Sequence, residues 1–259
     1  HEQAALKHAT WLGSPAMLLP NREASLHEES AYDHPTVKMK YARLLIEGLR
    51  ILIPSTLMLC HFFLLYTLFL GNFSPRELFA LFPFIELGIM LMMVGGFAFL
   101  KWVVIGRYKP NVIPLWHPFI RRKDIVEYTY GYFLQGQIIN FIMGTPFMTY
   151  FLRLLGTKIG RYNYIETGSF EEFDLIHIDD EVAINSNAII QTHLYEDRIF
   201  KMSHIHIHSR CTIGRDSIIL YDTTMETYSK VGSLSLLMKG ETLLEHTLWE
   251  GCPAQSKSE

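Results

Sequence analysis

The sequence is poor in cysteine and in charged side chains, and each shortage excludes a class of protein. The three cysteines, Cys60, Cys211 and Cys252, are far apart and lack the spacing of metal ligands. No disulfide framework is therefore expected, and a reducing compartment is the simpler environment. Only 19% of the residues are charged and the net charge is −3, so nothing draws the whole molecule towards nucleic acid. Residues 1–36 are polar and mixed, so no signal peptide is expected there.

Hydrophobic residues, at 49%, are abundant and gather in two long runs. Residues 51–70 contain no charged side chain, and residues 78–100 contain only Glu86. An apolar helix of about 20 residues spans the roughly 30 Å core of a bilayer. Two buried helices of a soluble domain are the alternative, but two such runs so close together, with Ser74-Pro75 as a turn between them, are rare there. We therefore predict a transmembrane helical hairpin over residues 49–105.

Positive charges lie mainly on the outer flanks of this hairpin. The turn has Arg76, whereas the flanks contain Lys38, Lys40, Arg43, Arg50, Lys101, Arg107, Lys109, Arg121, Arg122 and Lys123. The positive-inside rule then predicts a multi-pass membrane protein whose flanks, with the C-terminal half of the chain, are cytoplasmic. Within the spans, His61 and Glu86 lie at similar depth. They are expected to pair, either to hold the hairpin together or as part of a functional site.

A third apolar region, residues 130–155, is interrupted by polar residues and by Gly144-Thr145-Pro146. It is too polar for a span, so residues 106–156 are predicted to form an interfacial helical segment that rests on the membrane. Residues 18–48 are predicted to be a linker with a juxtamembrane helix.

A six-residue repeat fills the C-terminal part of the sequence. From Ile207 onward an apolar residue recurs at every sixth position, eight times in succession, and the register also appears upstream; these anchors are Ile159, Ile165, Ile178, Ile184, Ile190, Ile207, Ile213, Ile219, Met225, Val231, Leu237, Leu243 and Trp249. A small or β-branched residue follows most anchors by four positions, and Gly160, Gly214 and Gly232 directly follow theirs. Antiparallel strands, the alternative, have a period of two and produce no anchor every six residues.

This period is typical of a parallel β-helix. Each hexapeptide forms a short strand and a turn, three make one triangular coil, and the anchors point inward and stack. Glycines after the anchors are expected to ease the backbone at the corners. Parallel crossovers are normally right-handed; hexapeptide coils are the known exception, so the handedness is taken from the motif. The predicted fold is therefore α plus all-β, a transmembrane helical hairpin followed by a left-handed parallel β-helix over residues 157–259.

Two interruptions break the repeat. Between Ile165 and Ile178 the register slips by one residue, around Glu171-Glu172-Phe173-Asp174. Ile190 and Ile207 are 17 residues apart, so a loop must leave the coil between them. Expelled loops are where repeat scaffolds tend to carry function.

The expelled loop contains the predicted catalytic residues. His193 can act as a general base because the pKa of a histidine lies near neutrality. Asp174 and Glu196 are the carboxylates expected to orient it. The side chains expected to bind substrate are Gln191, Asp197, Arg198 and Lys201. The alternative is that His193 is an ordinary polar residue of a loop.

Three further histidines, His204, His206 and His208, alternate along one predicted strand and therefore share a face. Such a face can bind zinc, as in a γ-carbonic-anhydrase-like site. Each histidine neighbours an inward isoleucine, however, so outward and solvated side chains are expected and no metal is predicted.

The repeat, the Thr192-His193 pair and the ending over residues 249–254 resemble hexapeptide-repeat acetyltransferases of the maltose and nodulation-sugar type. This resemblance implies that His193 is the catalytic base. It also implies that sister β-helices assemble, because hexapeptide domains commonly form trimers with sites between subunits.

A second resemblance covers nearly the whole chain. It is to the membrane-bound C-terminal region of ε-poly-lysine-synthetase-like nonribosomal peptide synthetases, and it is carried by residues 101–110, 115–116, 144–160, 173–175, 191–201 and 232–241. In that family transmembrane helices surround tandem acetyltransferase-like domains, which join aminoacyl units delivered by adenylation and carrier modules.

The second resemblance implies an acyl or aminoacyl transferase that forms a peptide or isopeptide bond. The donor would be a thioester of phosphopantetheine or CoA, with no cofactor bound directly. The expected partners are the lipid bilayer, the carrier-bound donor and sister β-helix repeats, and not nucleic acid.

The two ends of the chain echo each other. Residues 6–16 recur as residues 244–254 with six identities in eleven, at an offset of 238. Residues 1–17 are therefore predicted to be the tail of a preceding β-helix, and the chain one period of a tandem array. Departures from the repeat at Met225-Glu226-Thr227, His208 and Glu250 leave an alternative, a catalytically inactive β-helix that serves as a structural module of a membrane complex.

Overall fold

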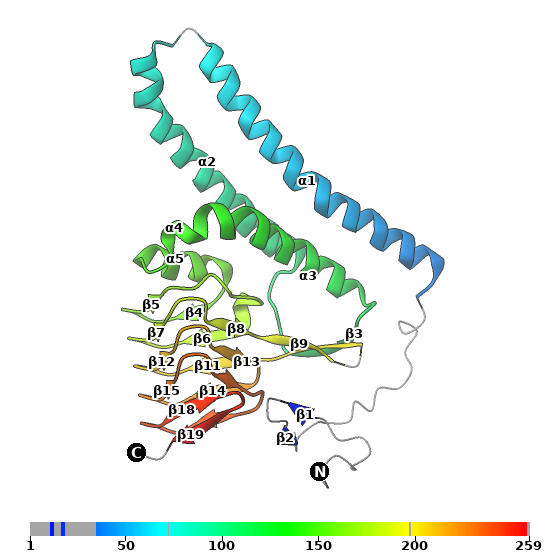
Figure 1. Ribbon diagram of the computed structural model, residues 1–259. Coiled ribbons are helices and arrows are strands. Elements are labelled where there is room, and N and C mark those ends of the chain that lie inside the picture. The colour runs from blue at the N-terminus through cyan, green and yellow to red at the C-terminus, as the bar shows by residue number, and fades with distance from the viewer. Residues whose placement is uncertain (1–10, 13–16, 19–34, 72, 197, 258–259) are drawn as a thin grey trace.

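A computed structural model describes residues 11–12, 17–18, 35–71, 73–196 and 198–257. Figure 1 shows two long helices, then a layer of shorter helices, then a β-helix. The helices are α1 (Val37–Leu70), α2 (Pro75–Val104), α3 (Pro118–Thr129), the π-helix η2 (Tyr130–Ile139), α4 (Asn140–Ile142) and α5 (Pro146–Leu155).

The segment between the two long helices is built as a helix start. The Ser74 hydroxyl accepts a hydrogen bond from the Glu77 N–H, and the Glu77 carboxylate accepts one from the Ser74 N–H at 2.7 Å. Pro75 follows at the first helical position, where a missing N–H leaves no hydrogen bond unmade. This capping box, together with the proline, ends the turn and begins α2.

By length and composition, α2 is suited to a membrane, since Arg76–Val104 is long and apolar enough to cross one. In the described part of α1 the apolar stretch, Met58–Leu70, is shorter. The pairing expected within the spans is present, with His61 Nε2 3.4 Å from Glu86 Oε1. That α1 and α2 together form a transmembrane hairpin stays a prediction.

The layer of short helices lies between the long helices and the β-helix (Figure 1). Its inner face joins the core of the first coils through fully enclosed side chains, namely Leu134, Ile139, Met148, Leu152 and Leu155. On its outer face Phe141 and Phe147 are 74% and 67% exposed. An exposed apolar surface of this kind suits the interfacial position predicted for residues 106–156.

The β-helix has three parallel sheets, one along each side, and from β4 to β8 and from β11 to β18 consecutive strands enter different sheets. The first contains β4 (Lys158–Ile159), β6 (Ile176–Ile178), β11 (Ile205–Ile207), β14 (Thr223–Met225) and β17 (Thr242–Leu243). The second contains β5 (Tyr164–Ile165), β7 (Ala183–Ile184), β12 (Thr212–Ile213), β15 (Lys230–Val231) and β18 (Leu248–Gly251), with β19 (Ala254–Lys257) added antiparallel. The third contains β8 (Ile189–Gln191), β13 (Ile218–Leu220) and β16 (Leu236–Leu237). The left-handed sense of the coil stays a prediction.

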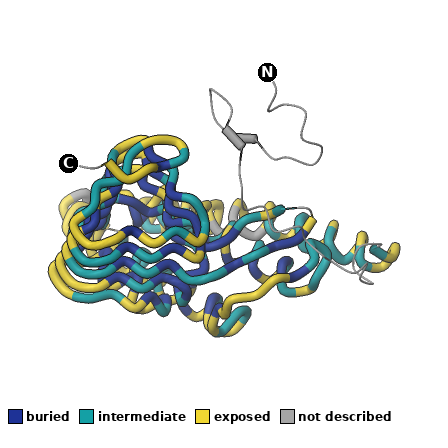
Figure 2. Tube along the Cα trace, turned by 90° about the horizontal axis from the view of Figure 1, so that it is seen from below, coloured by how far each residue is buried: buried dark blue, intermediate teal, exposed yellow. Residues whose placement is uncertain are grey.

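The predicted anchors stack inside the coil. Ile178, Ile207, Met225 and Leu243 are successive register partners in the first sheet, and none is more than 2% exposed. Figure 2 shows buried residues along the inside of the stacked coils and exposed ones on the outer turns. Burial of one large apolar side chain contributes about 1.5–3 kcal/mol, so each stacked anchor stabilises the coil by about this amount.

The glycines that follow the anchors do not have the role predicted for them. Gly214 and Gly232 are not in the left-handed region; instead, a Cβ at Gly214 would collide with the backbone of Gly232 and Ser233 in the next coil. The left-handed residues come two positions later, at Asp216 (φ 55°) and Leu234 (φ 58°). Close approach of the next coil therefore requires a glycine at Gly214, and the corners accept residues with side chains.

The predicted expelled loop is a β-hairpin. β9 (His193–Glu196) and β10 (Ile199–Met202) pair antiparallel, and the other edge of β10 pairs with β3 (Asn111–Pro114). In Figure 1 this small sheet projects sideways from the coil. Phe200 is completely buried and packs in a second core with Ile113. A segment far upstream thus holds the hairpin in place.

The same small hairpin occurs at both ends of the chain. In β1 (Trp11–Leu12) and β2 (Met17–Leu18), Trp11 lies opposite Leu18. In β18 and β19, Trp249 lies opposite Ser256, which is the equivalent pair at the offset of 238 residues. Residues 1–10 and 13–16 lie outside the described part of the chain, and that residues 1–17 are the tail of a preceding β-helix stays a prediction.

Candidate active site

A buried histidine lies where the hairpin leaves the coil. His193 is the first residue of β9 and comes two positions after the end of β8. It is 5% exposed, and its ring packs against those of Tyr195 and Phe200, with centroids 5.4 and 4.7 Å away. The predicted base is therefore held in one position, largely shielded from water.

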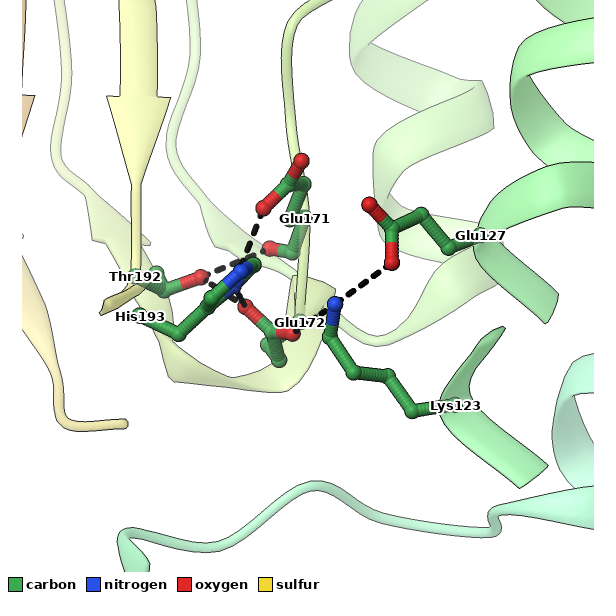
Figure 3. A network of polar contacts seen from close by, with 6 residues as sticks. All are labelled: Lys123, Glu127, Glu171, Glu172, Thr192 and His193. Atoms are coloured by element: carbon green, nitrogen blue, oxygen red, sulfur yellow. Dashed lines mark hydrogen bonds and ion pairs between the residues drawn. The ribbon is translucent and has the colours of Figure 1, made fainter. Parts of the chain in front are cut away.

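Two carboxylates from the other interruption of the repeat contact this histidine (Figure 3). His193 Nδ1 lies 2.8 Å from Glu172 Oε2 and 2.9 Å from Glu171 Oε2. The Thr192 hydroxyl also donates a hydrogen bond to Glu172 Oε2, at 2.5 Å. A parallel bridge between Phe170 and Ile190 sets the two segments side by side. The two irregularities of the repeat thus meet at one site.

The carboxylates determine the protonation of His193. Burial lowers the pKa of His193, but the hydrogen bonds with Glu171 and Glu172 and the charge of Glu172 outweigh it and raise the pKa to about 9. Burial likewise favours a high pKa for Glu172, but the hydrogen bond and charge of His193, with the charge of Lys123, bring it below its ordinary value. At neutral pH an imidazolium therefore lies between two carboxylates, and it becomes a proton acceptor as the pH rises.

A buried lysine completes the balance of charge. Lys123 of α3 is 1% exposed, and its Nζ lies 2.5 Å from Glu127 Oε2 and 3.6 Å from Glu172 Oε1. Burial favours a lower pKa for Lys123, but the charges of Glu172 and Glu127 raise it above its ordinary value, so the lysine stays cationic. Figure 3 shows the resulting row of alternating charges from Glu127 to Glu171. Because α3 also contacts α1 and α2, this row connects the site to the long helices.

Asp174, which we predicted to orient His193, has other partners in the structure. Its Oδ2 accepts hydrogen bonds from Lys101 Nζ at 2.7 Å and from the Tyr108 N–H at 3.1 Å. Lys101 is completely buried near the end of α2, so this ion pair fastens α2 to the short 3₁₀-helix η3 (Phe173–Leu175). The prediction was wrong because the backbone bends at Glu172, with φ 33°, and neighbouring carboxylates leave the bend in different directions.

Replacing Asp174 with asparagine tests this separation of roles. Removing the charge of one partner from a buried ion pair is expected to lower the free energy of unfolding by about 3–5 kcal/mol, measured by denaturant titration in detergent. The pH dependence of activity should not move, because Asp174 does not contact His193. If the variant were stable and its pH profile shifted, the prediction that Asp174 orients His193 would be supported instead.

Glu196, the second carboxylate predicted to orient the base, also has other partners. Side chains alternate along a strand, so residues 193 and 196 of β9 face opposite sides of the small sheet. Glu196 Oε2 lies 2.8 Å from Lys239 Nζ and 3.4 Å from Lys201 Nζ. The structure therefore brings Glu196 together with Lys201, a predicted substrate ligand, but away from His193.

The other predicted substrate ligands are spread along the hairpin. Gln191 ends β8, half-buried, with Leu220 as its register partner. Arg198 is at the tip, with φ 63°, and its carbonyl accepts a hydrogen bond from the Leu115 N–H at 3.0 Å. Asp197 lies outside the described residues. Substrate binding by these residues stays a prediction.

Glu171, Glu172 and His193 are also the set with which the described part of the chain could hold a metal ion, since their ligand atoms all lie within 4.8 Å of one another. The cationic Lys123 already supplies positive charge beside Glu172.

One of the histidines that alternate along β11, His206, lies beside His177 of the neighbouring strand β6. The ring of His206 packs edge-on against that of His177 at 4.5 Å. Burial, followed by the charges of His206 and Lys158, lowers the pKa of His177 to about 4.

Two parts of the site were missed from the sequence. The signal for Glu171 and Glu172 was present, because the slip in the repeat contains a doubled carboxylate. Lys123 appeared only as one of many positive charges flanking the hairpin, and no local pattern connects it to His193.

Comparison with known proteins gives one related sequence and several structures. No protein-family model matches the chain. Delta-poly-L-ornithine synthetase from Acinetobacter baumannii is 35% identical over 252 residues, which cover 95% of this chain and 19% of that protein. The chain thus spans about a fifth of the length of this relative.

Among solved structures, a hexapeptide-repeat acetyltransferase from Vibrio cholerae, complexed with acetyl coenzyme A, is 21% identical; the match covers 39% of this chain and 58% of that one, with a TM-score of 0.35. A maltose O-acetyltransferase from Clostridium difficile is 16% identical, over 66% of this chain and 88% of that one, also with a TM-score of 0.35.

Proposed function

We propose that this chain is a membrane-bound module that transfers an acyl or aminoacyl group from a thioester to an amine. The chain is a homologue of one part of a poly-amino-acid synthetase, as its sequence predicted, and this supports the proposal. The donor is a thioester of carrier-bound phosphopantetheine or of CoA, and the product is a peptide or isopeptide bond. The apolar helix α2 supports attachment to the membrane.

The observation that carries this proposal is the contact between His193 and Glu172. With Nδ1 directed at Glu172 Oε2, 2.8 Å away, the proton on that nitrogen is fixed and Nε2 is left to act as the base. An anionic partner also stabilises the imidazolium that forms when Nε2 takes a proton. Glu172 is thus the positioning residue, with Glu171 as a second negative charge.

In the proposed reaction the amine nitrogen attacks the thioester carbonyl while His193 Nε2 removes a proton from that nitrogen. A C–N bond forms, the C–S bond breaks, and the proton passes from Nε2 to the departing thiolate. The products are an amide and a free thiol, so neither an oxidant nor a reductant is needed. Positioning of the two substrates and general-base catalysis are the contributions asked of the protein.

The direct test uses the full-length protein in membranes or detergent, with an aminoacyl-pantetheine thioester as donor and a free amino acid as acceptor. We expect amide product and free thiol in equal amounts, measured by mass spectrometry and thiol titration. Thiol release without amide would indicate a thioesterase. Absence of both, in a protein that assembles normally, would favour the alternative of a structural β-helix.

A further inference from the structure

An apolar cavity lies between the long helices and the layer beneath them, and His193 is not among its lining residues. Its volume is about 620 Å³, within the range of about 300–1,000 Å³ that is typical of small-molecule sites. α1 lines it from Ile46 to Leu64, α2 from Ile89 to Leu100, and α3 and η2 close its base from Ile125 to Gln137. Both long helices contact α3, so the base of the cavity is closed by packed helices.

The lining defines the chemistry of the occupant. Apart from a few polar groups such as His61 and Gln137, the described lining residues are aliphatic, aromatic or methionine side chains, and Arg50 is the one with a full charge at every pH of interest. A ligand with many positive charges would lose its hydration in this cavity without gaining a negatively charged partner, so such a ligand is disfavoured. A long apolar tail with an anionic head near Arg50 fits.

Arg50 has capacity for such a head group. One guanidinium nitrogen lies 2.7 Å from Glu47 Oε2, and the group lies over the ring of Tyr128, 4.8 Å from its centroid. Its Nε is buried and has no hydrogen-bond partner among the described residues. A buried donor without a partner is costly, and a phosphate oxygen would satisfy it.

The position of Arg50 along α1 matches the boundary of a membrane. It lies about 30 Å along the helix from Leu70, where α1 ends, and this is about the thickness of a bilayer core. From Arg50 the cavity extends towards the middle of that distance, to His61 and Leu64. A phospholipid places its phosphate and tail at these same two depths.

We propose that this cavity binds one phospholipid, with an acyl tail among α1, α2 and η2 and the phosphate at Arg50. The inference goes beyond the proposed reaction and depends only on the membrane attachment of the long helices. Because α3 contributes both to the cavity and, through Lys123, to the charge row at His193, the bound lipid supports the element on which the active site rests.

Two adjacent glycines of α2 provide a matched test. Neither a Cβ at Gly95 nor one at Gly96 would meet any atom within 4 Å, but Gly96 lines the cavity and Gly95 does not. Both Gly96→Leu and Gly95→Leu replace a helical glycine by a better helix former. Only the first fills the cavity.

The probe is dioleoyl phosphatidylglycerol, titrated into the detergent-purified protein and followed by native mass spectrometry. We expect wild type and Gly95→Leu to retain one lipid, and Gly96→Leu to bind about tenfold more weakly. Arg50→Gln should reduce the preference for phosphatidylglycerol over phosphatidylcholine and keep some binding of both. Equal binding by the two glycine variants, or a protein dimer that excludes lipid, would overturn the proposal.

Sedimentation with membranes is measured on the same variants, together with amide formation. A protein that sediments with membranes and makes amide, yet retains no phospholipid, refutes the lipid site alone. A protein that retains the lipid but makes no amide refutes the proposed reaction alone.

Discussion

His193→Ala is expected to lower the rate of amide formation by about 10²–10⁴-fold, the usual contribution of a general base. The loss should appear in kcat and in kcat/KM alike, because the base acts in the transition state and not in binding of the thioester. The measurement is the rate of thiol release from the aminoacyl-pantetheine donor with saturating acceptor.

His208→Ala is the matched control. His208 Nδ1 lies 2.9 Å from Asp179 Oδ2, so it is also a histidine paired with a carboxylate, but its side chain is 40% exposed. Its replacement should leave the rate within about twofold of wild type, because His208 is exposed and its partner is Asp179, not the carboxylates that contact His193. An unchanged rate in His193→Ala would exclude the base and leave the β-helix as a structural module.

The pH dependence of the wild-type protein follows from the same contacts. Activity should rise with pH and approach half of its maximum near the His193 pKa of about 9, because only the neutral ring accepts a proton. Hydroxylamine is used as the acceptor because it is already neutral across this range, and its uncatalysed reaction with the thioester is measured without protein and subtracted. The stabilisation of the fold by this histidine has the opposite trend: it is complete below the ordinary pKa of 6.5 and is lost as the pH rises through about 9.

Glu172→Gln should change both the pH profile and the stability. Without the Glu172 charge the pKa of His193 falls back towards its ordinary value, so the rising limb of activity moves to lower pH. At the same time Lys123 and His193 lose a buried counter-charge, which is expected to reduce the free energy of unfolding by about 3–5 kcal/mol. The two readouts are the pH–rate profile with hydroxylamine and denaturant unfolding in detergent.

Glu181→Gln makes the same chemical change at a comparable backbone position. Glu181 also has a left-handed φ, 58°, and its carboxylate lies 2.8 Å from Arg210 Nε, but both side chains are 49% exposed. We expect a loss of about 0–1 kcal/mol and no movement of the pH profile. If Glu172→Gln also left the pH profile and the free energy of unfolding nearly unchanged, the charged residues around His193 would have no role in activity or stability.

The fold was predictable where it depends on a periodic pattern. An inward side chain at every sixth position, from Ile207 to Leu243, identifies the stacked coil without knowledge of any long-range contact, because each coil packs only on its neighbours. The start of α2 was equally local, since Ser74, Pro75 and Glu77 form its cap within four residues. The small sheet of β3, β9 and β10 was not predictable, because β3 lies far upstream and has no repeat to reveal its partner.

The candidate site was likewise predictable only where it depends on the spacing of residues along the chain. The breaks in the six-residue repeat, at residues 171–174 and after Ile190, were visible in the sequence, and they selected His193. Which carboxylate meets the histidine was decided by a single left-handed residue, Glu172, which sends its own side chain to His193 and that of Asp174 to Lys101. A backbone bend of this kind depends on tertiary packing.

The sequence by itself thus determined the coil, its two interruptions and the histidine in the second of them, because these follow from spacing along the chain. Only the tertiary structure decided the charges around that histidine. Lys123 and Lys101, counted in the sequence as free positive charges beside a membrane, are buried and paired with Glu172 and Asp174. The physical reason is that a charge removed from water must find an opposite charge in space, and its position along the chain does not show where that partner lies.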